Sequence, residues 1–248
     1  MSRSLCLGGQ AILVRGDAFG CLEESERPGV IVLDPPFELY SPDWIMNLEA
    51  ALPECDHMIV FSKFPYTGLV QTEFKKLPLV AEFIWHYTDM CTFRAQHMPL
   101  IHHETISIFS RDKGDIDMGA IRRPHAVTKP PKFTTRKSRG KEGKPLHWQQ
   151  DDRGGWPSSV IHKQRSLDGE LLGESTPIGV KPVDLIMQFL PAFPGGVLDP
   201  FMGSGSIGVA AMKMGRFYEG IELDVDNYNL AVERIRNARA QGDLFATS

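Results

Sequence analysis

The chain has 248 residues and a formal net charge of −4 at pH 7, with 42% hydrophobic and 23% charged residues, a composition typical of one globular domain or of one domain with a large insertion. No run of about 18 apolar residues is present, and the N-terminus lacks the apolar stretch of a signal peptide, so we expect no membrane span and a cytoplasmic location. The four cysteines form no Cys-x-x-Cys pair, which argues against a zinc site or a disulfide framework, and we expect no metal.

Apolar runs typical of strands alternate with segments typical of helices over most of the chain. Continuous β-branched runs favour strands buried on both faces of a parallel sheet, and the predicted strands span 11–15, 30–34, 57–62, 82–88, 103–109, 197–199 and 217–222. The fourth and fifth strands are expected to form a hairpin-like pair. Helices are predicted over 42–52, 66–77, 182–191, 204–214 and 226–240. This alternation predicts an α/β fold with a doubly wound, mostly parallel sheet.

Residues 111–160 interrupt this pattern with proline, glycine and charge, and we interpret them as an irregular insertion. Nine cations stand against one acid, Glu142, within residues 121–144, so this segment carries +8 and leaves −12 to the rest of the chain. A basic segment on an acidic body is typical of contact with a polyanion, and a solvated loop is the alternative interpretation. The nine cations are Arg122, Arg123, Lys129, Lys132, Arg136, Lys137, Arg139, Lys141 and Lys144.

A glycine-rich loop, Gly203-Ser204-Gly205-Ser206-Ile207-Gly208, follows one predicted strand and opens a helix. Glu222 lies 19 residues after Gly203, at the end of the next strand, where a carboxylate can hold ribose hydroxyls. No Lys-Ser or Lys-Thr follows the loop, which argues against a nucleoside triphosphatase. A nicotinamide or flavin dehydrogenase and an S-adenosylmethionine site both fit this pattern.

An acid immediately before the loop favours the second of these sites. Asp199 would repel a pyrophosphate, but it would attract the ammonium and sulfonium groups of S-adenosylmethionine. Only 40 residues follow Gly208, too few for the remaining strands of the sheet. We therefore expect those strands to come from upstream, in a permuted order.

The tetrapeptide Asp34-Pro35-Pro36-Phe37 ends the strand at 30–34. The Asp34 carboxylate and the Pro35 carbonyl could each accept a hydrogen from the exocyclic amino group of a base, which localises the lone pair of that nitrogen for attack on a sulfonium methyl group. Phe37 could stack on a base flipped out of a duplex. A rigid turn with an ordinary aspartate is the alternative interpretation. Methylation of cytosine at carbon 5 is disfavoured because the chain has no Pro-Cys nucleophile motif.

Together these patterns resemble the amino-methylating DNA methyltransferases, which act on N6 of adenine or N4 of cytosine, in the permuted order called the β group. The resemblance covers nearly the whole chain and implies a circularly permuted, seven-stranded Rossmann-like sheet. Its matching segments are Gly16-Asp17, Asp34 to Phe37, Trp85 with the stretch from Arg94 to Ile106, Trp156 to Val160, Lys181-Pro182, Asp199 to Gly205, and Gly220 to Asp224.

The resemblance implies S-adenosylmethionine as the methyl donor and double-stranded DNA as the partner. It assigns catalysis to Asp34, Pro35, Pro36 and Phe37. It assigns donor binding to Asp17, Lys181, Asp199, Phe201, Gly203, Ser204, Gly205, Glu222 and Asp224, with Lys181 and Asp199 at the methionine end, Glu222 on the ribose and Asp17 near the adenine. It divides the chain into a catalytic half over 1–110, a target-recognition insertion over 111–160 whose nine cations contact phosphates, a donor-binding half over 161–240 and a tail over 241–248.

An Asp-Pro-Pro motif followed by an aromatic residue usually accompanies adenine in this family, so we predict adenine N6 and keep cytosine N4 as the alternative. A non-catalytic DNA-binding or clamp-associated protein is the alternative from another class. The segment from Gln241 to Phe245 resembles the Gln-x-x-Leu-Phe peptides that bind bacterial sliding clamps, and a helix end folded back on the body is the competing interpretation. The sequence is compatible with a monomer or a dimer.

Overall fold

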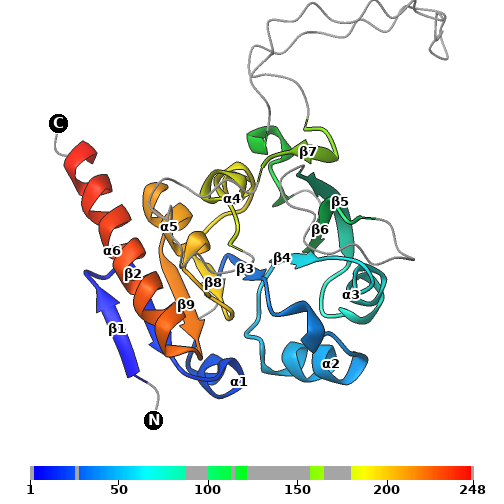
Figure 1. The fold of residues 1–248 in the computed structure, drawn as a ribbon, viewed down its shortest axis with the longest axis horizontal. Helices are drawn as coiled ribbons and strands as arrows, with labels where there is room; N and C mark the ends of the chain where they lie inside the picture. Colours follow the sequence, from blue (N-terminus) through cyan, green and yellow to red (C-terminus); the bar gives the residue numbers. More distant parts are fainter. Residues whose placement is uncertain are drawn as a thin grey trace, which may run out of the picture.

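The structure, a computed structural model, describes residues 3–25, 28–87, 100–112, 115–121, 157–164 and 180–246. These residues form one twisted sheet with helices on both of its faces (Figure 1). The strand order is β1-β2-β9-β8-β3-β4-β6-β5-β7. The strands are β1 (Arg3–Leu7), β2 (Ala11–Arg15), β3 (Val30–Leu33), β4 (His57–Ser62), β5 (Leu79–His86), β6 (His103–Ser110), β7 (Val160–His162), β8 (Val197–Asp199) and β9 (Tyr218–Glu222).

The centre of the sheet is parallel and its flanks are mixed. From β2 to β4 every neighbouring pair is parallel, whereas β6 runs antiparallel to both β4 and β5. β1 is antiparallel to β2, and β7 is parallel to β5. The predicted α/β class, the mostly parallel sheet and the hairpin-like pairing of β5 with β6 are confirmed.

The sheet has nine strands in the described part of the chain, where the sequence predicts seven. The seven predicted strands occupy consecutive positions from β2 to β5, and the two additional strands, β1 and β7, lie one at each edge. β8 and β9, from the C-terminal part of the chain, lie between β2 and β3. The permuted order predicted from the position of the glycine loop is therefore confirmed.

The helices form one layer on each side of the sheet (Figure 1). The helices are α1 (Ala18–Cys21), α2 (Pro42–Ala51), α3 (Thr67–Glu73), α4 (Val183–Phe189), α5 (Ser206–Lys213) and α6 (Val225–Ala246). Ser41 caps α2, because its Oγ accepts a hydrogen bond from the amide of Trp44 at 3.2 Å. The helix predicted over 226–240 is longer in the structure, where α6 spans Val225–Ala246.

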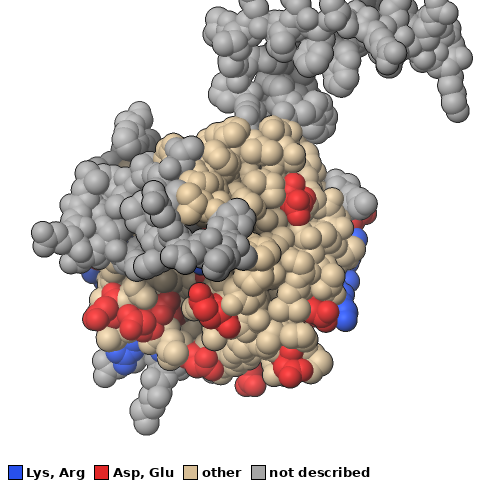
Figure 2. All heavy atoms as spheres, turned by 45° about the vertical axis from the view of Figure 1, so that its right-hand side comes forward, with Lys and Arg blue, Asp and Glu red and all other residues tan. Residues whose placement is uncertain are grey.

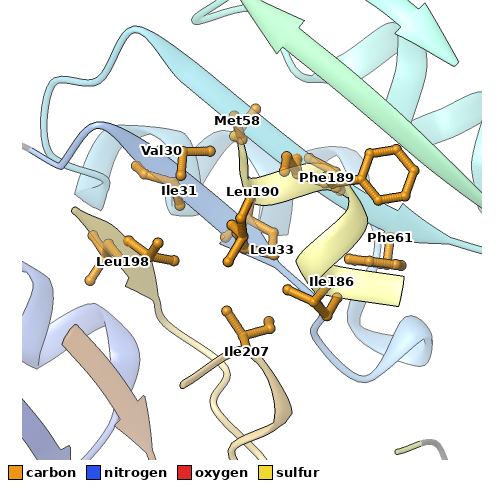
Figure 3. Packing of buried hydrophobic residues seen from close by; sticks show 14 of the residues in the cluster. Val30, Ile31, Leu33, Met58, Phe61, Ile186, Phe189, Leu190, Leu198 and Ile207 are labelled. Atoms are coloured by element: carbon orange, nitrogen blue, oxygen red, sulfur yellow. The ribbon is translucent and has the colours of Figure 1, made fainter. Parts of the chain in front are cut away.

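Apolar packing between α4 and the sheet holds the two halves of the chain together. Ile186 and Phe189 of α4 lie over β3 and β4 in Figure 3, and Phe189 meets Phe83 edge-on with ring centroids 5.1 Å apart. All of these side chains are buried, and burying each one stabilises the fold by roughly 1.5–3 kcal/mol. Because α4 is fixed over β3, the residues just before α4 lie close to the residues just after β3.

Candidate active site

A cavity of about 1060 Å³, here called the central cavity, opens at the carboxyl ends of the parallel strands. Its walls come from the segments that follow β2, β3, β4, β8 and β9, represented by Asp17, Asp34, Lys63, Phe201 and Glu222. Ligands of open α/β sheets bind at this edge, where loops from neighbouring strands converge. The fold thus brings the tetrapeptide and the glycine loop, which are far apart in sequence, into one cavity.

The tetrapeptide forms one end of the central cavity. Asp34, Pro35, Pro36 and Phe37 all line it, and Phe37 begins a short 3-10 helix, η2 (Phe37–Leu39). The Phe37 ring is only 9% exposed and stacks on Tyr40, with centroids 6.3 Å apart. Tyr40 donates a hydrogen bond to the carbonyl of Phe61 at 2.9 Å. A buried aromatic anchor therefore fixes the position of the Phe37 ring.

Lys181, which the sequence predicts to bind the donor, contacts Asp34 of the tetrapeptide in the structure. Its ammonium is 2.7 Å from each carboxylate oxygen of Asp34 and 3.3 Å from Oε2 of Glu104. Burial disfavours the charged ammonium, but the two carboxylates outweigh this penalty and raise the pKa of Lys181. Lys181 is thus a buried cation that neutralises Asp34, although it also lines the central cavity.

The glycine loop is held from behind by α6. Gly205 has φ +82°, and a Cβ there would lie 2.9 Å from Cβ of Ala231, so this position requires glycine. Arg234 of α6 donates to the carbonyl of Ser204 at 2.6 Å and approaches Oγ of Ser204 at 3.1 Å. The predicted donor-binding residues Phe201, Gly203 and Ser204 line the central cavity, whereas Gly205 faces α6.

Glu222, at the other end of the central cavity, links the glycine loop to the segment between β9 and α6. Its carboxylate accepts hydrogen bonds from the amides of Gly203 at 2.7 Å and Asp224 at 2.8 Å. Asp224 in turn accepts bonds from the amides of Asp226 and Asn227 at the start of α6. Asp17, Glu222 and Asp224, which the sequence predicts to bind the donor, all line the central cavity, and Asp224 also caps α6.

Asp199, whose contact with the ammonium of the donor stays a prediction, is not among the residues that line the central cavity. It is fully buried, accepts a hydrogen bond from Tyr218 at 2.9 Å and accepts another from the amide of Phe201 at 3.2 Å. Burial raises the pKa of Asp199 to about 8, against the smaller opposing effect of these two bonds. Asp199 thus bonds to the start of the loop that follows β8 and to Tyr218 of β9.

This buried acid should make stability depend on pH. The folded protein binds a proton at Asp199 between its usual pKa of 3.8 and about 8, so the free energy of unfolding falls as pH rises through this range. Asp199→Asn keeps the size and an acceptor oxygen but does not ionise. We expect the difference in melting temperature between this variant and the parent, variant minus parent, to increase from pH 5 to pH 9. A difference that stays constant over this range, as expected for the exposed control Asp226→Asn, would contradict the assignment.

Sequence reasoning missed several residues of the central cavity. Lys63 lines it and lies over the Phe37 ring, 4.8 Å from the centroid. Lys63 directly follows the strand predicted over 57–62, which lies next to β3, and this position could have identified it as a cavity residue. Trp44, the third residue of α2, also lines the central cavity and contacts Phe201, with centroids 5.8 Å apart.

The predicted DNA contacts lie outside the described residues, since all nine cations fall within 122–144. Acidic side chains are spread over the described face shown in Figure 2, with basic side chains near its edges. The phosphate contacts of the nine cations stay a prediction. So does the clamp peptide, whose backbone from Gln241 to Phe245 belongs to α6.

Within the described ranges, no helix is long and apolar enough to cross a membrane. The described residues also contain no group of three or more His, Cys, Asp or Glu side chains placed to hold a metal ion.

Comparisons with known proteins agree on one family. A family model described as DNA methylase matches residues 30–233. The Type II methyltransferase M1.MboII of Moraxella bovis is 25% identical over 251 residues, covering 87% of this chain and 92% of that protein. The crystal structure of the M1.HpyAVI–SAM complex has a similar fold, with a TM-score of 0.59 and 18% identity, and the match covers 91% of this chain and 98% of the M1.HpyAVI chain. The cytosine-N4-specific PvuII DNA methyltransferase covers 94% of each chain, with a TM-score of 0.63 and 14% identity.

Proposed function

The chain belongs to the DNA methylase family of amino-methylating DNA methyltransferases, and we propose that it methylates N6 of adenine at a specific site in double-stranded DNA. The family uses S-adenosylmethionine, which supplies an electrophilic methyl group on a positively charged sulfur. The observation that carries the proposal is that Asp34 and the glycine loop line the same cavity. One cavity can therefore hold an amino group and a methyl donor next to each other.

The residues at the Glu222 end fit the adenosine part of the donor. The two backbone amides that bond to Glu222 fix its carboxylate, which can still accept bonds from ribose hydroxyls. Leu223 and Val225 line the central cavity and are 69% and 45% exposed, respectively. A flat apolar ring would cover these side chains, which otherwise face water.

The Asp34 end fits an amino group that must become a nucleophile. The Asp34 side chain is 18% exposed, and a carboxylate has about four acceptor positions. Asp34 can therefore accept an N–H from the base while it keeps its contact with Lys181. That bond localises the lone pair of the nitrogen, and Phe37 orients the plane of the base by stacking.

An acidic first residue in the tetrapeptide supports adenine as the target, as the family pattern implies for Asp34 followed by Pro35, Pro36 and Phe37. Cytosine N4 is the alternative left open, since both targets present an exocyclic amino group to the same acceptors. The family match favours methyl transfer over the nicotinamide-dependent and non-catalytic alternatives.

The test is nucleoside mass spectrometry of plasmid DNA from a methylation-deficient host that expresses the chain. We expect N6-methyladenine, and none of it in cells that express Asp34→Ala at the same level. N4-methylcytosine would overturn the choice of base and keep the mechanism. No modified base from a folded protein that binds the donor would contradict the proposal.

Replacing Glu222 with glutamine should weaken donor binding. The Nε2 group of glutamine is a donor, so it cannot accept from both the Gly203 and Asp224 amides. We expect the Kd for S-adenosylmethionine to rise roughly 10-fold to 100-fold, the effect of losing about 1–3 kcal/mol of binding energy. Calorimetry or the fluorescence of Trp44 would measure it, with Asp226→Asn, an exposed acid outside the cavity wall, as the control. An unchanged Kd would remove Glu222 from the donor site.

A further inference from the structure

A buried carboxylate lies behind the partly exposed Asp34. Glu104, the second residue of β6, is 3% exposed, and its Oε2 lies 3.3 Å from the ammonium of Lys181. Lys181 thus sits between two carboxylates, with Asp34 on the side of the central cavity and Glu104 toward the sheet. Three separate segments of the chain supply these three groups, here called the buried triad.

The charge of the buried triad suits a site that must take up a proton. One ammonium and two carboxylates carry a formal charge of −1, whereas Asp34 and Lys181 alone would carry zero. A proton arriving at Asp34 brings the triad to zero. The same proton would leave an uncompensated buried cation if Glu104 were absent, which is costly in a low-dielectric interior.

Methylation of an amino group releases such a proton. The amino nitrogen of the base displaces sulfur from the methyl carbon, so the nitrogen–carbon bond forms as the carbon–sulfur bond breaks, and that electron pair remains on sulfur. The nitrogen then carries a positive charge until it gives up one proton. Asp34 is the acceptor already bonded to that N–H in the mechanism above.

We propose that Glu104 is a positioning residue for methyl transfer: it holds Lys181 against Asp34 and supplies the negative charge that lets Asp34 take the proton from the methylated amino group. This role rests on the proposed function and deepens it, since it concerns the same site. Glu104 does not line the central cavity, so it acts through Lys181 and not on the base.

Three other charged or titratable groups of the described residues lie near Asp34 and have different positions or charges. Lys63, after β4, lies over Phe37 and adds a second cation on the cavity side. Tyr40 is buried, and its pKa is raised by burial and by Asp34, so it stays neutral. Burial raises the pKa of Asp199 of β8, which disfavours a negative charge on this carboxyl. Glu104 thus supplies the second negative charge of the buried triad.

The experiment measures single-turnover methyl transfer from pH 5 to pH 9 with saturating donor and DNA, for the parent and for Glu104→Gln. The variant keeps the shape and loses the charge. We expect its plateau rate to fall roughly tenfold, within the usual range for proton transfer to a positioned group. The acidic limb should move to lower pH by roughly one unit, because an aspartate without a like charge nearby ionises more readily. Donor Kd and melting temperature should stay close to the parent values.

Two further variants make the outcome decisive. Glu104→Asp retains the charge and should recover part of the rate and the parent pH profile. Glu73→Gln removes a surface carboxylate of α3 and should behave as the parent. A Glu104→Gln profile identical to that of Glu73→Gln would overturn the role, and so would a variant that loses rate, donor binding and stability together with an unmoved pH limb. A parent that methylates neither adenine nor cytosine would instead overturn the proposed function, and this role with it.

Discussion

Asp34→Ala should lower the rate of methyl transfer by about 10³-fold or more, the upper part of the range for removing a positioned acid–base group. Alanine removes both the acceptor for the amino hydrogen and the site that takes the proton. The fold should survive, because Lys181 keeps Glu104 as a partner 3.3 Å away. Single-turnover assays with radiolabelled donor would measure the rate.

Asp34→Asn separates the two tasks of this residue. Asparagine keeps an acceptor oxygen and loses the capacity to take a proton, so we expect a smaller loss, roughly 10²-fold. The donor should raise the melting temperature of both variants as it does that of the parent. If Asp34→Ala kept more than a tenth of the parent rate, Asp34 would not be the residue that activates the amino group.

Lys181→Met should be the most destabilising single change in the described part of the central cavity. It leaves the partly buried Asp34 and the buried Glu104 as neighbouring carboxylates without a counter-charge, and breaking a buried ion pair in this way typically costs about 3–5 kcal/mol. For a chain of this length that loss lowers the melting temperature by about 10 °C. Thermal unfolding at pH 7 would measure it, and the loss should shrink at acidic pH, where protonated carboxyls need no counter-charge.

Two further variants identify the cause of this loss of stability. Lys75→Met removes a surface ammonium that is 72% exposed and 3.4 Å from Glu73, so it should change stability by less than about 0.5 kcal/mol. Adding Glu104→Gln to Lys181→Met should restore part of the stability, because one of the two like charges is gone. A double variant less stable than Lys181→Met would show that packing of the lysine stem, and not charge, causes the loss.

The central strands could be predicted because their amino-acid sequences are apolar, as expected for strands that are buried on both faces. Residues 30–33 and 58–61 are continuous apolar runs, and every residue of β3 and β4 is buried. The edge strands have no such signal. β7 has three residues, and β1 depends on the turn at Gly8 and Gly9, both with positive φ, a glycine pair that was the available hairpin signal.

The site could be predicted as a set of motifs but not as a set of contacts. Asp34, Phe201 and Glu222 lie at or just after the ends of strands, so their meeting at one sheet edge follows from the fold. The contact between Lys181 and Asp34 could not be predicted in this way, since a long side chain can reach several groups and the two residues are 147 positions apart in sequence. Asp199 also lies at the end of a strand, yet its carboxylate is buried and bonds to Tyr218 and to the Phe201 amide.

The strand order has a consequence for how the protein is made. β2 is complete by residue 15 and β3 by residue 33, but the strands that join them, β8 and β9, end at residues 199 and 222. During synthesis on the ribosome, β2 and β3 each keep one edge unpaired until β8 and β9 have been synthesised. Folding from the first half alone is therefore incomplete, and nascent chains depend on late, long-range pairing that is slow and open to aggregation.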